Sequence, residues 1–111
     1  MERIYNKLVR DKIPNIIKEK GEIPVVRILD ETEYKKELEK KLYEEYKEVI
    51  EASGDDRVEE LADMIEVIRA LANLENKNLN EVIDIADKKN EKRGAFEDKV
   101  FLEKVIETKI K

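Results

Sequence analysis

Residues 58–74 read VEELADMIEVIRALANL, and this stretch decides the fold because apolar residues cover most of its helical wheel. At an advance of about 100° per residue, only one narrow polar wedge is left. A helix of this kind is normally buried among other helices or between subunits. Two acids, Glu60 and Asp63, nevertheless lie on its apolar side. Buried carboxylates must be paired, protonated or bound to a metal, so these two indicate a site.

A second long helix is expected just before this stretch, from about Glu33 to Ala52, with Asp30 or Thr32 as its cap. The break at residues 53–55 contains Gly54 and predicts a tight antiparallel helix hairpin. Asp55 or Asp56 is expected to cap the helix that follows.

The earlier helix also carries acids toward the hairpin. Glu45 falls within its apolar stripe, and Glu48 follows at the border of that stripe. Because residues three apart share a helix face, each helix directs a pair of acids, Glu45 with Glu48 and Glu60 with Asp63, into the space between them. Four facing carboxylates repel strongly unless divalent cations bind between them.

The rest of the chain predicts further elements around the hairpin. Pro14 opens a short helix through Lys20, and a long helix runs from Leu79 to Arg93. Residues 25–29 are a β-branched run typical of a strand, and residues 100–106 are either a second strand or a terminal helix. We expect these two runs to pair. The predicted fold is therefore a mainly all-α helical bundle with a short two-stranded β element, in one domain, residues 1–111.

Composition excludes several kinds of chemistry. The 111 residues include no cysteine and no histidine, which leaves carboxylates, lysines, arginines and tyrosines for any reaction. Oxygen ligands suit Mg²⁺, Mn²⁺ or Ca²⁺. The net charge of −5 does not favour nucleic acid, and no run has the length of a membrane span. The N-terminus does not resemble a signal peptide, so we expect a cytoplasmic protein without a membrane or nucleic-acid partner.

A simpler interpretation of the acid pairs also exists. The chain contains 28 acidic residues, so pairs three apart arise by chance, and most helix charges are merely solvated. The placement of both pairs on apolar faces across a short turn is rarer and favours a metal site.

The sequence also resembles a known family. KLYEEYKE (41–48) and EELAD (59–63) resemble the E-x-x-E and E-x-x-D motifs of the all-α nucleoside triphosphate pyrophosphohydrolases, which include MazG-like enzymes, phosphoribosyl-ATP pyrophosphohydrolase and dimeric dUTPases. YNKLVRDKIP (5–14) and KRGAF (92–96) resemble a compact MazG-like subgroup.

This resemblance implies Mg²⁺-dependent hydrolysis of a nucleoside triphosphate, canonical or modified, between the α and β phosphates, with a house-cleaning role. Mn²⁺ is an alternative cofactor and phosphoribosyl-ATP an alternative substrate. The implied metal ligands are Glu45, Glu48, Glu60 and Asp63, and one of these glutamates or Glu44 is the candidate base.

Phosphate binding requires cations near the metal. The resemblance favours Lys89, Lys92 and Arg93, with Lys7, Arg10 and Lys12 as second candidates. The simpler interpretation of the first group is a favourable charge at a helix C-terminus. Tyr43 and Tyr46 either stack on a base or belong to the core.

Two classes of function remain from the sequence. The first is the pyrophosphohydrolase, expected to form homodimers or homotetramers because so apolar a helix needs more covering than a small chain offers. The second is a non-catalytic oligomeric binding or regulatory module, in which salt bridges with Lys41, Lys47 or Arg69 neutralise the acids.

Overall fold

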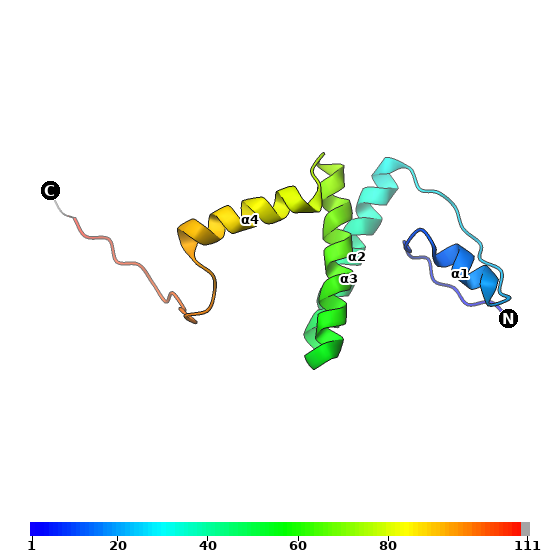
Figure 1. Cartoon of the computed structure of the whole chain (residues 1–111), viewed down its shortest axis with the longest axis horizontal. Helices are drawn as coiled ribbons and strands as arrows, with labels where there is room; N and C mark the ends of the chain where they lie inside the picture. Colours follow the sequence, from blue (N-terminus) through cyan, green and yellow to red (C-terminus); the bar gives the residue numbers. More distant parts are fainter. Residues whose placement is uncertain (110–111) are drawn as a thin grey trace. The chain divides into compact units, whose positions relative to one another are not determined.

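The computed structural model describes residues 1–109, which form four α-helices joined by irregular segments (Figure 1). The helices are α1 (Ile13–Glu19), α2 (Glu31–Glu51), α3 (Gly54–Leu74) and α4 (Leu79–Arg93). The mainly all-α prediction is confirmed. The chain divides into two compact units, of which the first comprises residues 1–79 and the second begins at Asn80. The prediction of a single domain stays a prediction.

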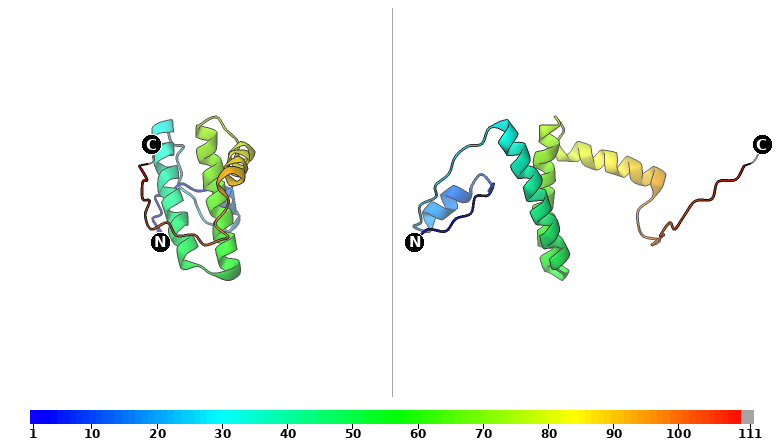
Figure 2. Two further views of the ribbon diagram at one scale, coloured as in Figure 1. Left: turned by 90° about the vertical axis from the view of Figure 1, so that its left-hand side faces the viewer. Right: turned by 180° about the vertical axis from the view of Figure 1, so that it is seen from behind.

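Helices α2 and α3 form the predicted antiparallel hairpin and lie side by side along their length (Figure 2). Helix α2 begins after Asp30, whose side chain accepts a hydrogen bond from the Glu33 N–H at 2.8 Å, as predicted for an N-cap. Arg57 in α3 closes the other end of the hairpin. Its Nε–H donates to the carbonyl oxygens of Val49 (3.1 Å) and Ala52 (2.9 Å), which the end of α2 leaves without helical partners.

The start of α3 differs from the prediction. Its N-cap residue is Ser53, in extended conformation, and Asp55 and Asp56 lie in the first turn instead of capping the helix. In the first turn their charges are still favourable, because the N-terminal end of a helix carries partial positive charge.

The hydrophobic core between α2 and α3 is small. Leu38 of α2 is 3% exposed, and Val67 and Ala72 of α3 are the other buried hydrophobic residues within the described chain. On α3, Leu61 and Ile65 remain exposed although the wheel of this helix is apolar nearly all round. The hairpin therefore buries one stripe of α3 and leaves a second stripe uncovered.

The other two helices match the predicted positions. Helix α1 has Pro14 in its first turn and ends one residue before the predicted Lys20. Helix α4 ends at Arg93, and Gly94 follows with φ of +80°, a left-handed conformation that suits glycine at a helix end. None of the described helices combines the length and the apolar character needed to cross a membrane.

The predicted β element is wrong. Residues 25–29 and 100–106 are irregular, and no strand occurs within residues 1–109. Val25 is 96% exposed and Val105 is exposed as well. β-Branched residues favour a strand only where a neighbouring strand supplies hydrogen bonds and a face to pack on, so the local pattern was not sufficient.

Candidate metal centre

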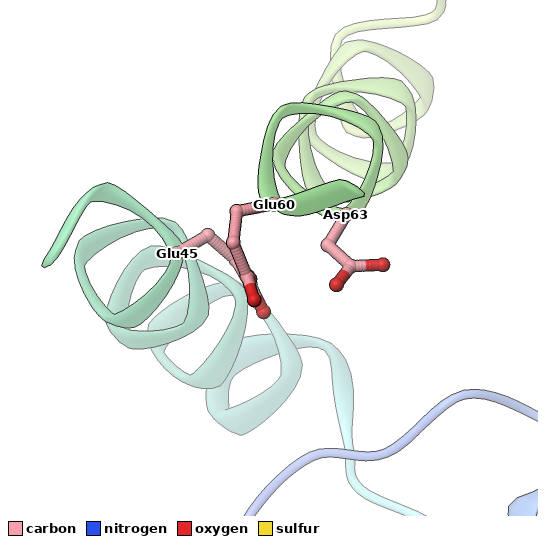
Figure 3. A group of neighbouring side chains, drawn as sticks. All are labelled: Glu45, Glu60 and Asp63. Atoms are coloured by element: carbon pink, nitrogen blue, oxygen red, sulfur yellow. The ribbon is translucent and has the colours of Figure 1, made fainter. Parts of the chain in front are cut away.

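Three carboxylates from the two hairpin helices meet in the space between them. Glu45 comes from α2, and Glu60 and Asp63 come from one face of α3, three residues apart. One oxygen of each carboxylate lies within 4.8 Å of one oxygen of each of the others. Figure 3 shows the Glu45 and Glu60 side chains directed to the same point, with Asp63 beside them. We call these three residues the acid cluster.

The acid cluster is partly removed from water, and two of its carboxylate oxygens have no hydrogen-bond partner. Glu45 is 8% exposed and is the buried charged residue of the described chain. The Oε2 atoms of Glu45 and Glu60 are both buried and have no hydrogen-bond partner. Buried carboxylate oxygens normally have hydrogen-bond partners, so these two atoms are exceptions within the described chain. The acid cluster could hold a metal ion, and a divalent cation would give these oxygens a partner.

Hydrogen bonding, burial and repulsion together raise the pKa of two members of the acid cluster. The pKa of Glu60 is raised to about 7, first by a hydrogen bond with the Glu48 carboxyl group, then by burial and by repulsion from Glu48, Asp63 and Glu45. Burial is the main cause that raises the pKa of Glu45, and repulsion from Glu48 and Asp63 adds to it. Without a cation, the acid cluster therefore holds protons that free carboxyl groups release at lower pH.

The other predicted acids border the acid cluster. Glu48 is exposed and is not one of the three converging residues, although its carboxyl group interacts with those of Glu45 and Glu60. Glu44 is half-buried, and its Oε2 lies 3.8 Å from the Lys7 Nζ and 3.6 Å from the Lys41 Nζ. The predicted roles of Glu44 as a base and Glu48 as a ligand stay predictions.

Two cations of the N-terminal segment reach these acids. The Arg10 Nη2 donates to Asp63 Oδ1 at 2.9 Å, and Lys7 faces Glu44. The third predicted cation of this segment, Lys12, is exposed at the N-cap position of α1. The sequence indicated Arg10 only through the family resemblance. Its partner lies 53 residues away, so helical periodicity carried no signal for this contact.

Two shallow grooves open beside the acid cluster, and Glu48 lines both of them. The first, about 370 Å³, is almost wholly acidic; its lining residues are Glu48, Glu51, Ala52, Asp56, Glu59 and Glu60. The second, about 300 Å³, combines both signs of charge; its lining residues are Lys7, Glu44, Lys47, Glu48 and Glu51. Glu51, Asp56 and Glu59 were not among the predicted site residues, because their solvent-facing helical positions are typical of surface acids.

The remaining predicted phosphate-binding residues belong to the second unit. Lys89, Lys92 and Arg93 are exposed on α4, with Lys92 and Arg93 in its last turn. Their positive charge there is favourable to the helix by itself. Their role in phosphate binding stays a prediction.

Tyr43 and Tyr46 of α2 do not belong to the core. Tyr43 is 60% exposed and Tyr46 is 51% exposed. Their rings stack with centroids 6.2 Å apart, and the Lys47 Nζ lies 5.3 Å from the Tyr43 ring centroid. The prediction that these two tyrosines belong to the core is therefore wrong. They form an exposed aromatic pair on the helix that carries Glu45.

The cations proposed to neutralise the acids in a non-catalytic module have other partners. Lys41 pairs with Glu44, Arg69 pairs with Glu66 at 2.9 Å, and Lys47 contacts the Tyr43 ring. Within the described residues, the salt bridge made by the acid cluster is the one from Arg10. These contacts leave Glu45 and Glu60 without the predicted salt bridges.

Comparison of the chain with protein-family models gave no match, and comparisons with curated proteins and with solved structures gave none either.

Proposed function

We propose that this chain is a divalent-metal-dependent pyrophosphohydrolase, which cleaves a nucleoside triphosphate between its α and β phosphates and releases a monophosphate and pyrophosphate. The observation that supports it most is the acid cluster, in which buried oxygens of Glu45 and Glu60 converge without hydrogen-bond partners. The family resemblance of the acidic motifs supports the choice of reaction.

Mg²⁺ is the proposed cofactor, with Mn²⁺ as the alternative. The donor set fits either ion, since three carboxylates without histidine or cysteine are hard oxygen ligands. A cation bound there can lower the pKa of a water molecule and stabilise negative charge on phosphate oxygens. Glu45, Glu60 and Asp63 would hold the cation, and Glu48 lies beside them without converging on the same point.

Glu48 is also the proposed proton acceptor for the attacking water. Its carboxyl group lies next to Glu60 and lines both grooves, so it can reach solvent and the acid cluster. Glu44 is the weaker candidate because Lys7 and Lys41 both engage it. A carboxylate that lies next to the proposed metal ligands, but does not bind the metal itself, keeps a lone pair free to accept the proton.

The phosphate groups are bound by cations of the N-terminal segment. Lys7 and Arg10 already lie at the acids, and Lys7 lines the mixed groove. Lys89, Lys92 and Arg93, together with Lys12, remain further candidates by resemblance. Arginine suits this role because its planar guanidinium binds two phosphate oxygens at once.

We further propose that the enzyme acts as a homodimer or homotetramer. Val58, Leu61 and Ile65 lie at helical spacing of three and four on α3, and all three are exposed. With so few buried hydrophobic residues in the described chain, a second copy that covers this stripe supplies the missing burial.

An assay of the purified protein with Mg²⁺ tests the function. It uses a panel of canonical and modified nucleoside triphosphates together with phosphoribosyl-ATP. The expected product is pyrophosphate together with a monophosphate, and not orthophosphate with a diphosphate. Glu60→Gln should remove this activity, whereas Glu39→Gln, an exposed position on α2, should keep it. Absence of pyrophosphate from every nucleotide, with Mg²⁺ and with Mn²⁺, would reject the proposal.

A further inference from the structure

The salt bridge between Arg10 and Asp63 engages one member of the acid cluster and leaves the other two without a salt bridge. The Arg10 Nη2 lies 2.9 Å from Asp63 Oδ1, while the buried Oε2 atoms of Glu45 and Glu60 have no partner. A divalent metal bound to the acid cluster would therefore compete with Arg10 for Asp63.

The backbone and the side chain of Arg10 are held differently. The Arg10 carbonyl oxygen accepts a hydrogen bond from the Ile13 N–H at 3.0 Å, which fixes the backbone to the start of α1. The side chain is 59% exposed, and the Asp63 side chain is about half exposed. An ion pair this exposed is weak, so a divalent ion that binds three carboxylates at once can displace the guanidinium from it.

We propose that Arg10 is an exchangeable counterion of the acid cluster: it pairs with Asp63 when no metal is bound, and metal binding releases its guanidinium to the phosphates of the nucleotide. This inference rests on the proposed function. It adds an order of events, in which the metal frees the arginine that the substrate then uses.

The exchange has two consequences of opposite sign. Removal of the Arg10 charge removes a competitor and a repulsive neighbour of the metal, so metal binds more tightly. The same removal takes away a phosphate contact, so the nucleotide binds less tightly. An arginine that merely stabilises the fold would weaken both, since a loosened hairpin would spread the ligands apart.

Arg3 provides a matched control within the same segment. Its Nη2 pairs with Glu22 Oε2 at 2.7 Å, its side chain is also 59% exposed, and Glu22 is about as exposed as Asp63. Arg3→Gln and Arg10→Gln therefore change the net charge equally and each break one exposed ion pair. A difference between them reports on the acid cluster alone.

Calorimetric titration of the full chain with Mg²⁺ alone, without nucleotide, tests the exchange. Arg10→Gln should bind Mg²⁺ about three- to tenfold more tightly than Arg3→Gln, a range expected for one partly screened unit charge near a divalent ion. Arg10→Lys keeps the charge and should bind Mg²⁺ as the natural chain does. In the nucleotide assay, Arg10→Gln should raise KM about tenfold, as expected for the loss of a charge-assisted contact.

The arginine side-chain N–H signals in a nitrogen-15 spectrum of the unmodified chain provide a readout that does not depend on a variant folding. The Arg10 signal should move saturably with Mg²⁺, and the Arg3 signal should not. Equal Mg²⁺ affinity in Arg10→Gln and Arg3→Gln, or an unmoved Arg10 signal, would overturn the exchange and leave the metal site intact. Absence of Mg²⁺ binding in the unmodified chain would reject both the exchange and the proposed function.

Discussion

Glu45→Gln should stabilise the metal-free chain and remove its response to Mg²⁺. Glu45 is 8% exposed, its Oε2 has no hydrogen-bond partner, and Glu48 and Asp63 repel its charge. An unsatisfied buried polar atom costs about 1–3 kcal/mol, and more if it is charged. Glutamine keeps the shape, loses the charge and brings N–H donors that the neighbouring carboxylates can accept.

The lower end of that range applies, because the raised pKa of Glu45 lets it take up a proton and relieve part of the cost. A gain of about 1 kcal/mol corresponds to an increase in Tm of roughly 4–8 °C for a chain of this size. The same substitution removes a proposed metal ligand, so Mg²⁺ should no longer raise Tm. In the unmodified chain, Mg²⁺ at a hundred times its Kd should add about 2.7 kcal/mol.

Thermal unfolding followed by circular dichroism, with and without excess Mg²⁺, measures both effects. Glu39→Gln is the control, since Glu39 is exposed on the same helix. This variant should change the free energy of unfolding by less than about 0.5 kcal/mol and should keep the Mg²⁺ response. A lower Tm for metal-free Glu45→Gln, or a Mg²⁺ response equal to that of the unmodified chain, would refute the reasoning.

Three further predictions concern pH and the hairpin. The pKa of Glu60 is about 7 in the fold against an ordinary value of 4.5, so the folded chain binds the proton more tightly than the unfolded chain. The stability that this proton contributes is fully present below pH 4.5 and is lost as the pH rises to about 7. The Tm of the metal-free, unmodified chain should therefore fall over this range. In Glu60→Gln the fall should be much smaller. Leu38→Ala should lower the free energy of unfolding in urea by about 2–3 kcal/mol, because Leu38 is the most deeply buried hydrophobic residue described. A loss under about 0.5 kcal/mol would contradict the described core. Asp30→Ala should cost about 1 kcal/mol through the lost N-cap, and Asp30→Asn should restore most of it, whereas equal losses in both would argue against the cap.

Much of the hairpin could be predicted because its signals are local. Apolar periodicity, the Gly54 break and the Asp30 cap each act within a few residues, and they placed α2 and α3 correctly apart from the cap of α3. Once two helices are joined by so short a turn, they must lie antiparallel, and residues near the turn face each other. The sequence alone was therefore sufficient to place Glu45 and Glu60 together.

What the sequence did not reveal depends on contacts between distant segments. The Arg10 pair with Asp63 requires the path of the N-terminal segment, which no periodic pattern describes. The strands predicted at 25–29 and 100–106 were wrong because a strand depends on its partner as much as on its own residues. Glu48 was predicted by its spacing to join the acid cluster, yet its position at the edge of the apolar stripe leaves it exposed beside that cluster.

The central claim is that Glu45, Glu60 and Asp63 bind a divalent cation, and a titration of the nucleotide-free chain with Mn²⁺, followed by electron paramagnetic resonance, measures this directly. We predict saturable binding that Mg²⁺ displaces, that Glu45→Gln and Glu60→Gln each abolish, and that Glu39→Gln retains. Mn²⁺ that stays free in solution with the folded chain, or binding that both cluster variants retain, would contradict the account.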